Sequence, residues 1–267
     1  MSWVIAFAIG ASVGSCVNVV ADRVPHRRSL LNPRADCSSC KRPLSNKELV
    51  PVFSYLWLRG MCRHCREAIP FRIFFVEVIA GLLFMAVYLR CGFGFGFVVL
   101  SAAVSFLLAV AIIDLEHKLI LNRIVFPGLL AVLIVAPFWP LLGLTRTFLG
   151  GSEMLASLAN SIVAGAGAFL IFLTIYLVYP QGMGEGDVKL AGLIGLLVGF
   201  PGLMVALLGG IVSGGMVAIV LLALRKKGRE EEISFGTFLS SATIVALLWG
   251  SDIISGYEHV LGRIMSL

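Results

Sequence analysis

The sequence predicts an all-α membrane protein, a polytopic bundle of about eight transmembrane helices that carries a small loop domain on its cytoplasmic side. Of the 267 residues, 59% are hydrophobic and only 13% are charged, so the chain cannot cover itself with a polar surface. Its apolar residues stand in long continuous runs, whereas a membrane β-barrel would need short alternating strands. Lipid is therefore the expected solvent of most of the chain.

Eight apolar runs approach the roughly 20 residues that a helix needs to cross the bilayer core. They cover residues 2–21, 72–90, 95–113, 120–138, 155–179, 188–200, 203–224 and 236–252. The first run lacks the basic start and the cleavage site of a signal peptide, so we expect it to be retained. The sixth is short, and Phe200-Pro201-Gly202 should turn it sharply into the seventh. Glycines four apart, Gly195 with Gly199 and Gly210 with Gly214, predict close helix packing.

Basic residues predict the orientation of the bundle. Residues 22–72 hold 11 of the 21 lysines and arginines, and a second basic segment spans 225–229. By the positive-inside rule both loops face the cytoplasm, which leaves both termini outside when eight helices are counted. The net charge of +6 mostly reflects this topology, with membrane lipid and not nucleic acid as the expected surroundings. The expected organisation is a first transmembrane helix (1–21), a cytoplasmic loop domain (22–71) and a membrane-embedded core (72–267).

Four of the six cysteines lie in this loop domain as two C-x2-C pairs separated by 21 residues: Cys37 with Cys40, and Cys62 with Cys65. Each pair can turn two thiolates toward one ion, and two pairs complete the tetrahedral coordination of a structural zinc site. A reducing cytoplasm keeps thiols available for metal, and zinc would supply a core that the loop otherwise lacks. The alternative is a set of redox-active or idle thiols.

Two aspartates indicate the chemistry. Asp114 ends the third apolar run and Asp187 begins the sixth, and these two runs cross the membrane in opposite directions. Both aspartates should therefore reach the same cytoplasmic level, although they are far apart in the sequence. Two neighbouring carboxyl groups share one proton, so one can activate water as a general base while the other protonates a peptide carbonyl as a general acid. Each also has a simpler interpretation, Asp187 as a helix cap and Asp114 as an interfacial charge.

Four further residues are candidates for substrate binding or support. Gly184 and Gly186 lack Cβ atoms and could let an extended peptide approach the backbone. Lys189 could tune the pKa of a neighbouring acid, although a charge at the membrane edge is the simpler interpretation. Glu77 lies within an apolar run, where an ionisable group is costly, and should bond within the bundle to Arg72 or to a backbone group.

Taken in order, several segments resemble those of the type IV prepilin peptidases, the prepilin leader peptidase and N-methyltransferase family. They are GSCVNVVADRVP (14–25), the paired C-x2-C loop, FRIFFVEVIAGLLF (71–84), IIDLEHKLILN (112–122), GMGEGDVKL (182–190) and ISFGTFL (233–239). The Gly-x-Gly-Asp element is weak alone, whereas the ordered set is highly specific and covers nearly the whole chain.

The resemblance implies a multi-pass enzyme of the bacterial inner membrane with Asp114 and Asp187 as its catalytic pair. It would remove the short basic leader of type IV prepilins or pseudopilins after a glycine, on the cytoplasmic side. It would then methylate the new N-terminus with S-adenosylmethionine as the methyl donor. The residues of this sequence do not locate the donor site.

The chain departs from the usual family pattern at a few positions. Cys16 and Val17 stand in place of Phe-Leu, and Leu121, Ser234 and Thr237 stand where prolines are usual. None of these is one of the two aspartates or the four loop cysteines. The departures therefore bear on helix ends and substrate contacts.

Two other functions fit parts of the sequence. A proton-coupled transporter could use the same acids as a relay, but the chain shows no clear inverted repeats. A membrane-anchored zinc module would bind a partner or nucleic acid through its loop, and its bundle acids would then be dispensable.

Overall fold

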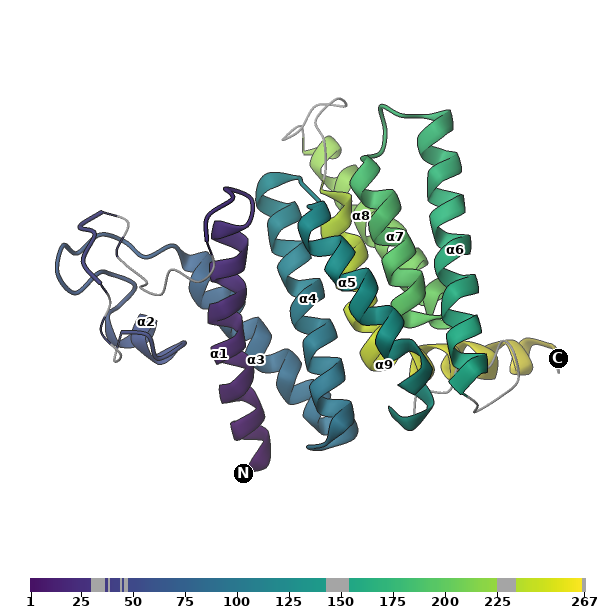
Figure 1. The fold of residues 1–267 in the computed structure, drawn as a ribbon, viewed down its shortest axis with the longest axis horizontal. Helices are drawn as coiled ribbons and strands as arrows, with labels where there is room; N and C mark the ends of the chain where they lie inside the picture. Colours follow the sequence, from purple (N-terminus) through teal and green to yellow (C-terminus); the bar gives the residue numbers. More distant parts are fainter. Residues whose placement is uncertain are drawn as a thin grey trace. The chain divides into compact units, whose positions relative to one another are not determined.

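A computed structural model describes residues 1–29, 37, 39–43, 45, 48–142, 154–224 and 234–265 (Figure 1). These residues form helices and no strands, as the sequence predicts. The helices are α1 (Ser2–Arg23), α2 (Phe53–Trp57), α3 (Phe71–Cys91), α4 (Phe95–His117), α5 (Asn122–Val135), the 3₁₀ helix η1 (Ala136–Leu142), α6 (Met154–Val178), α7 (Glu185–Val198), α8 (Gly202–Ala223) and α9 (Phe235–Met265). The expected basic segment 225–229 lies outside the described residues.

All eight predicted apolar runs form helices, and seven helices in the described part of the chain are long and apolar enough to cross a membrane. The exception is α7, whose 14 residues span about 21 Å at 1.5 Å per residue, less than the roughly 30 Å of the bilayer core. Its shortness was expected from the Phe200-Pro201-Gly202 turn. Asn160 of α6 holds this turn, because its side chain accepts from the Phe200 N–H at 2.7 Å and donates to the Phe200 carbonyl at 3.1 Å.

The described chain separates into two compact units, Met1–Ala109 and Val110–Leu267. In the first unit α1 and α3 lie side by side (Figure 1). Small residues allow this close approach: a Cβ on Gly10 would come within 2.5 Å of the Ala80 carbonyl oxygen, and one on Gly14 would come within 2.9 Å of the Glu77 Cα. Larger residues at either glycine would force α1 and α3 apart.

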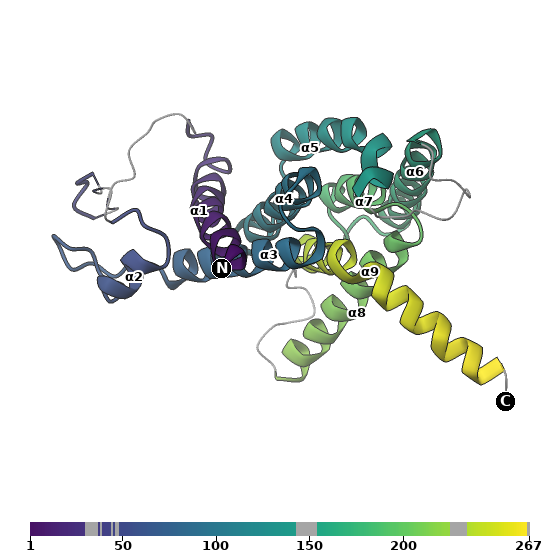
Figure 2. The same cartoon turned by 90° about the horizontal axis from the view of Figure 1, so that it is seen from below.

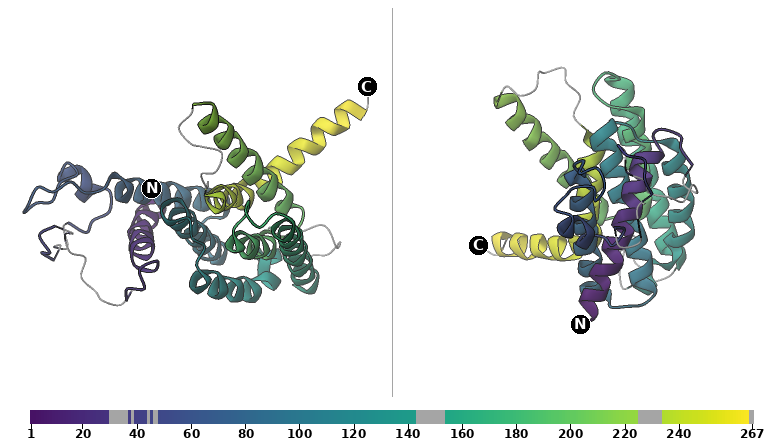
Figure 3. Two further views of the ribbon diagram at one scale, coloured as in Figure 1. Left: turned by 90° about the horizontal axis from the view of Figure 1, so that it is seen from above. Right: turned by 90° about the vertical axis from the view of Figure 1, so that its left-hand side faces the viewer.

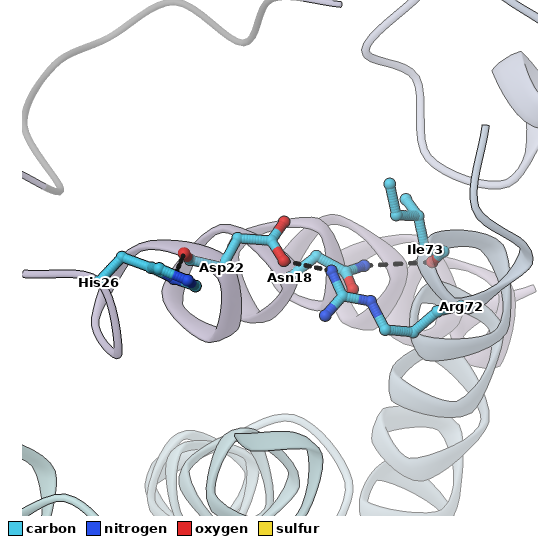
Figure 4. Close-up of polar contacts among 5 residues, drawn as sticks. All are labelled: Asn18, Asp22, His26, Arg72 and Ile73. Carbon is cyan, nitrogen blue, oxygen red and sulfur yellow. Dashed lines mark hydrogen bonds and ion pairs between the residues drawn. The ribbon is translucent and has the colours of Figure 1, made fainter. Parts of the chain in front are cut away.

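Polar side chains also connect α1 to the start of α3 (Figure 4). Asn18 is buried and donates to the Ile73 carbonyl at 3.1 Å. Arg72 forms an ion pair with Asp22, with 2.6 Å between Nη2 and Oδ1. Arg72 is therefore not the partner of Glu77 that the sequence suggested as one possibility. These bonds fix the α1–α3 pair at the end from which the loop domain emerges.

In the second unit the predicted glycine packing is partly confirmed. A Cβ on Gly195 of α7 would come within 2.5 Å of the Ala164 carbonyl oxygen of α6, and one on Gly210 of α8 would come within 3.1 Å of Leu239 of α9. Gly199 has a different role, because it ends α7 with a φ of 67°, a conformation that favours glycine. The second unit is thus held by two closely packed helix pairs, α6–α7 and α8–α9.

Helix α9 continues 13 residues beyond the predicted end at 252, to Met265. Its C-terminal half diverges from α8 and leads to the chain's C terminus (Figure 2, Figure 3). The charged residues Asp252, Glu258 and Arg263 interrupt the apolar residues of this half, so the sequence does not show it as a continuous apolar run. The first turn of α9, at the other end of this helix, contributes to the candidate site.

A candidate diacid active site and a four-cysteine cluster

Asp114 and Asp187 line the same cavity, as the opposite directions of their helices predict. The cavity has a volume of about 380 Å³ and lies within the second unit. Its wall is built from the end of α4, the connection from α4 to α5, and the turn that begins α7: Asp114, Lys118, Leu119, Ile120, Leu121, Asn122, Gly184, Glu185, Gly186, Asp187 and Lys189. Segments about 70 residues apart in the sequence thus face one space.

Asp187 is the third residue of the helical turn that follows Gly184. Its Oδ2 accepts a hydrogen bond from the Gly184 N–H at 3.2 Å, which satisfies a donor that the start of a helix leaves without a backbone partner. Burial, and then the nearby Asp114 carboxylate, raise the pKa of Asp187 to about 6. Asp187 therefore caps α7 and also holds a proton far more readily than an exposed aspartate does.

Asp114 is 4% exposed and is held by the first turn of α9. Its Oδ2 accepts from the Thr237 N–H at 2.6 Å and lies 3.0 Å from the Thr237 hydroxyl oxygen. Gly236 makes this approach possible, since a Cβ there would lie 3.0 Å from the same Oδ2 and 2.9 Å from Ile120 Cδ1. Sequence reasoning missed Thr237 as a site residue, although its position in ISFGTFL was noted as a departure from proline.

The side-chain bonds of Lys189 involve neither Asp114 nor Asp187. Its ammonium pairs with Glu185 one helical turn earlier and donates to the side-chain oxygen of Asn122 at 3.1 Å. This pairing lowers the pKa of Glu185. Lys189 thus connects the first turn of α7 to the start of α5, which keeps the two walls of the cavity together.

The two glycines of the α7 turn differ in their surroundings. A Cβ on Gly184 would lie 3.3 Å from Asp187 Oδ2, whereas one on Gly186 would lie only 2.7 Å from the Ile120 Cβ. Gly186 is therefore required for packing against the α4–α5 connection. Gly184 is exposed, and contact of its backbone with a substrate stays a prediction.

Glu77 belongs to the first unit, so it is not part of this cavity. It is 5% exposed, and its Oε2 accepts from the backbone N–H of Val52 at 2.7 Å. A backbone group is thus its partner, as one of the two sequence alternatives proposed. Val52 has a φ of 65°, which is unfavourable for a β-branched residue, so this bond holds a strained bend just before α2.

The four loop cysteines converge. The sulfur atoms of Cys37, Cys40, Cys62 and Cys65 all lie within 4.8 Å of one another, and those of Cys37 and Cys65 are 3.7 Å apart. A tetrahedral zinc site with Zn–S bonds of about 2.3 Å has sulfur–sulfur edges of ~3.8 Å. The thiols therefore fit a structural zinc ion.

The backbone of the two C-x2-C turns repeats one hydrogen-bonding pattern. The Cys37 N–H donates to the Arg42 carbonyl, and the Lys41 N–H donates to the Cys37 carbonyl. In the same way, the Cys62 N–H donates to the Glu67 carbonyl, and the Arg66 N–H donates to the Cys62 carbonyl. Lys41 and Arg66 occupy equivalent positions with positive φ values of 55° and 58°. Two copies of one tight turn thus present the four sulfur atoms.

Comparison with known proteins identifies the family of this chain. Two family models match: the Bacterial Peptidase A24 N-terminal domain over residues 8–91 and the Type IV leader peptidase family over residues 101–219. The chain is also 32% identical to a prepilin leader peptidase/N-methyltransferase of Pseudomonas putida, over 97% of this chain and 94% of the relative. The chain belongs to the type IV leader peptidase family.

Other members of the type IV leader peptidase family are similar over the same extent. Proteins with the same name from Aeromonas hydrophila and Bacillus subtilis (strain 168) are 30% and 28% identical, over 95% of this chain in each case and over 92% and 96% of their own lengths. No solved structure matches the chain. The first family model includes Glu77 and the four cysteines, and the second includes both Asp114 and Asp187.

Proposed function

We propose that this member of the type IV leader peptidase family is an aspartic endopeptidase that removes the basic leader of type IV prepilins or pseudopilins after a glycine. The observation that carries the proposal is that Asp114 and Asp187 line one cavity and that the charge of Asp114 contributes to the raised pKa of Asp187. The names of the curated relatives supply the substrate class.

Two carboxyl groups in one cavity can divide the work of peptide hydrolysis. One, as a carboxylate, takes a proton from the attacking water, while the other donates its proton to the scissile carbonyl and later to the leaving amine. A pKa near 6 at Asp187 supports this division, because the carboxyl group retains a proton close to neutral pH. The acids and water alone suffice for these steps.

The cytoplasmic location of this cavity is also part of the proposal. It rests on the 11 lysines and arginines of residues 22–72, which the positive-inside rule assigns to the cytoplasm of a bacterial inner membrane. A prepilin with a basic leader and a following apolar helix would enter from that side. Its leader stays in the cytoplasm while its helix remains in lipid.

Zinc is proposed for the loop domain, held by Cys37, Cys40, Cys62 and Cys65. When bound, the ion would supply a structural cross-link between the two C-x2-C turns. Arg42 donates to His64 Nδ1 at 3.3 Å, which gives this histidine a partner other than the metal. The loop would then present a defined surface on the cytoplasmic side.

N-methylation of the new N-terminus with S-adenosylmethionine is proposed from the family alone. The diacid cavity does not fit this donor, because none of the described residues that line it is aromatic, and three of them, Asp114, Glu185 and Asp187, are carboxylates. A flat adenine ring would find nothing there on which to stack. We therefore derive no step of methyl transfer from this cavity.

The test is mass spectrometry of a pilin N-terminus after incubation with the purified protein. Wild-type protein should shorten the prepilin by its leader, and Asp114→Asn and Asp187→Asn should each leave it uncut. Glu258→Gln on the projecting end of α9 is a matched control and should cut normally. Cleavage by both aspartate variants would end the proposal. Ion flux in proteoliposomes, with no change in pilin length, would instead favour a transporter.

A further inference from the structure

The Thr237 hydroxyl lies between two oxygen atoms. Its Oγ1 is 3.0 Å from the Ala111 carbonyl oxygen and 3.0 Å from Asp114 Oδ2, while the backbone N–H of Thr237 donates to the same Oδ2 at 2.6 Å. All three contacts join residues more than 120 positions apart in the sequence. They lie within the second unit, at the start of α9.

Counting protons shows what this arrangement permits. A hydroxyl has one proton to donate and can also accept, whereas the Ala111 carbonyl can only accept. When Asp114 is a carboxylate, the Thr237 hydroxyl can donate to Oδ2. When Asp114 is protonated on Oδ2, the carboxyl group donates to Thr237 Oγ1, and the hydroxyl proton turns to Ala111. The contact therefore survives in both protonation states.

The backbone of α9 strengthens this contact. Thr237 is the third residue of α9, so its N–H has no carbonyl partner within the helix and is available to Asp114. Gly236 removes the side chain that would otherwise block the approach. A proline at position 237 would have neither an N–H nor a hydroxyl, so both donors come from this chain's departure to threonine.

We propose that Thr237 is a positioning residue whose hydroxyl follows the proton of Asp114 and holds its carboxyl group in one orientation throughout turnover. Both contacts between Thr237 and Asp114 are made to Oδ2 of the aspartate, which leaves its Oδ1 for the water, the substrate or the second acid. The inference rests on the proposed peptidase function. A general base gains a proton and loses it again in every cycle, so a partner suited to both states keeps it in place.

The charged groups around Asp114 determine how loss of the Thr237 hydroxyl affects the pH dependence of cleavage. Asp187, Glu185 and Lys189 of α7 and Lys118 after α4 line the same cavity, and Glu185 and Lys189 pair with each other. The first turn of α9, residues 235–238, has no titratable side chain. Removal of the Thr237 hydroxyl therefore changes only an uncharged partner of Asp114.

The test compares Thr237→Val, which keeps the shape and the N–H but loses the hydroxyl, with Thr237→Ser, which keeps both donors. The full-length protein cleaves a synthetic peptide with a basic leader, a glycine and an apolar segment, and kcat and KM are measured from pH 5 to 9. A hydrogen bond to a charged group predicts a kcat loss of about ten-fold for Thr237→Val, with little change in KM. The acidic limb of its pH–rate profile should move upward by on the order of one pH unit. Thr237→Ser should keep the wild-type kcat and the wild-type pH–rate profile.

Thr243→Val is the matched control, because Thr243 lies buried on the same helix and donates only to the Leu239 carbonyl, at 2.6 Å. It should change neither kcat nor the pH profile. Wild-type kinetics in Thr237→Val would overturn the inference, as would equal losses in Thr237→Val and Thr237→Ser. If Asp114→Asn and Asp187→Asn both still cleave, the peptidase proposal itself fails. If Asp114→Asn is inactive while Thr237→Val is normal, only the role of Thr237 fails.

Discussion

The carboxyl group of Asp187 has two tasks that favour different protonation states. As a hydrogen-bond acceptor for the Gly184 N–H it serves best when ionised, but burial and the Asp114 charge favour the protonated form. The second influence is larger, since the pKa rises to about 6 from 3.8. Asp187 is therefore a residue at which the fold gives up stability to keep a proton in the proposed active site.

This trade-off predicts how stability depends on pH. A raised pKa means that the unfolded chain loses its Asp187 proton first, so folding stability falls as pH rises from 3.8 to about 6 and stays reduced above that. Asp187→Asn removes this penalty. Its unfolding temperature in detergent should exceed that of the wild type at pH 7.5, with a smaller difference at pH 4.5.

Glu185→Gln is a control of opposite sign. Lys189 lowers the pKa of Glu185, so the wild-type carboxylate contributes stability at pH 7.5 that is lost only as pH falls below 4.5 and through the lowered pKa. The glutamine variant should therefore be less stable than the wild type at pH 7.5. A stability difference for Asp187→Asn that did not change with pH would contradict our account.

Among the helices, α7 depends most closely on its neighbours. It is short, its first turn carries Asp187, and its two faces meet Ile120 and α6 through glycines. Because the carboxyl group is fixed to the first turn, a small shift of α7 moves Asp187 relative to Asp114.

Gly186→Ala should therefore impair cleavage more than stability. The added Cβ would lie 2.7 Å from Ile120 Cβ, which must push the start of α7 away from the α4–α5 connection. We expect a fall in kcat of at least ten-fold, since reacting groups tolerate little misplacement. Gly167→Ala in α6, where a Cβ meets nothing within 4 Å, should leave cleavage unchanged and stabilise its helix slightly. Equal activities of the two variants would contradict this prediction.

The paired C-x2-C turns give a prediction for the loop domain. Purified wild-type protein should contain one zinc ion per chain by elemental mass spectrometry, and Cys62→Ser should lose it, because Cys62 is the buried member of the cluster. Cys91→Ser, at the end of α3, should keep the ion. Folded wild-type protein without metal would refute the zinc site.

For the molecule as a whole, the proposed orientation places the α6–α7 turn in the cytoplasm and the α3–α4 turn outside. A cysteine introduced at Gln181 or at Phe93, in a chain without Cys16 and Cys91, tests this with a maleimide that cannot cross the membrane. In intact spheroplasts the reagent should label position 93 and spare position 181. The reverse labelling would overturn the cytoplasmic location of the diacid.

The helices and the diacid were predictable because each corresponds to a pattern in the sequence. Continuous apolar runs mark helices to within a few residues, and counting those runs brought Asp114 and Asp187 to one level. The role of Thr237 matches no comparable sequence pattern, since this residue is neither titratable nor near Asp114 in the chain. The end of α9 was predicted too early because Asp252, Glu258 and Arg263 interrupt the apolar residues there, unlike in a continuous bilayer-crossing run.

The bonds from Thr237 to Asp114 also have a consequence for biosynthesis. Asp114 emerges from the ribosome well before α9, yet the N–H and the hydroxyl that bond to its carboxyl group belong to Thr237. A nascent chain that has inserted only as far as α8 has both aspartates but lacks the groups that hold one of them. Full assembly of the proposed diacid site thus waits for α9, so we expect cleavage activity only after α9 has been synthesised and inserted.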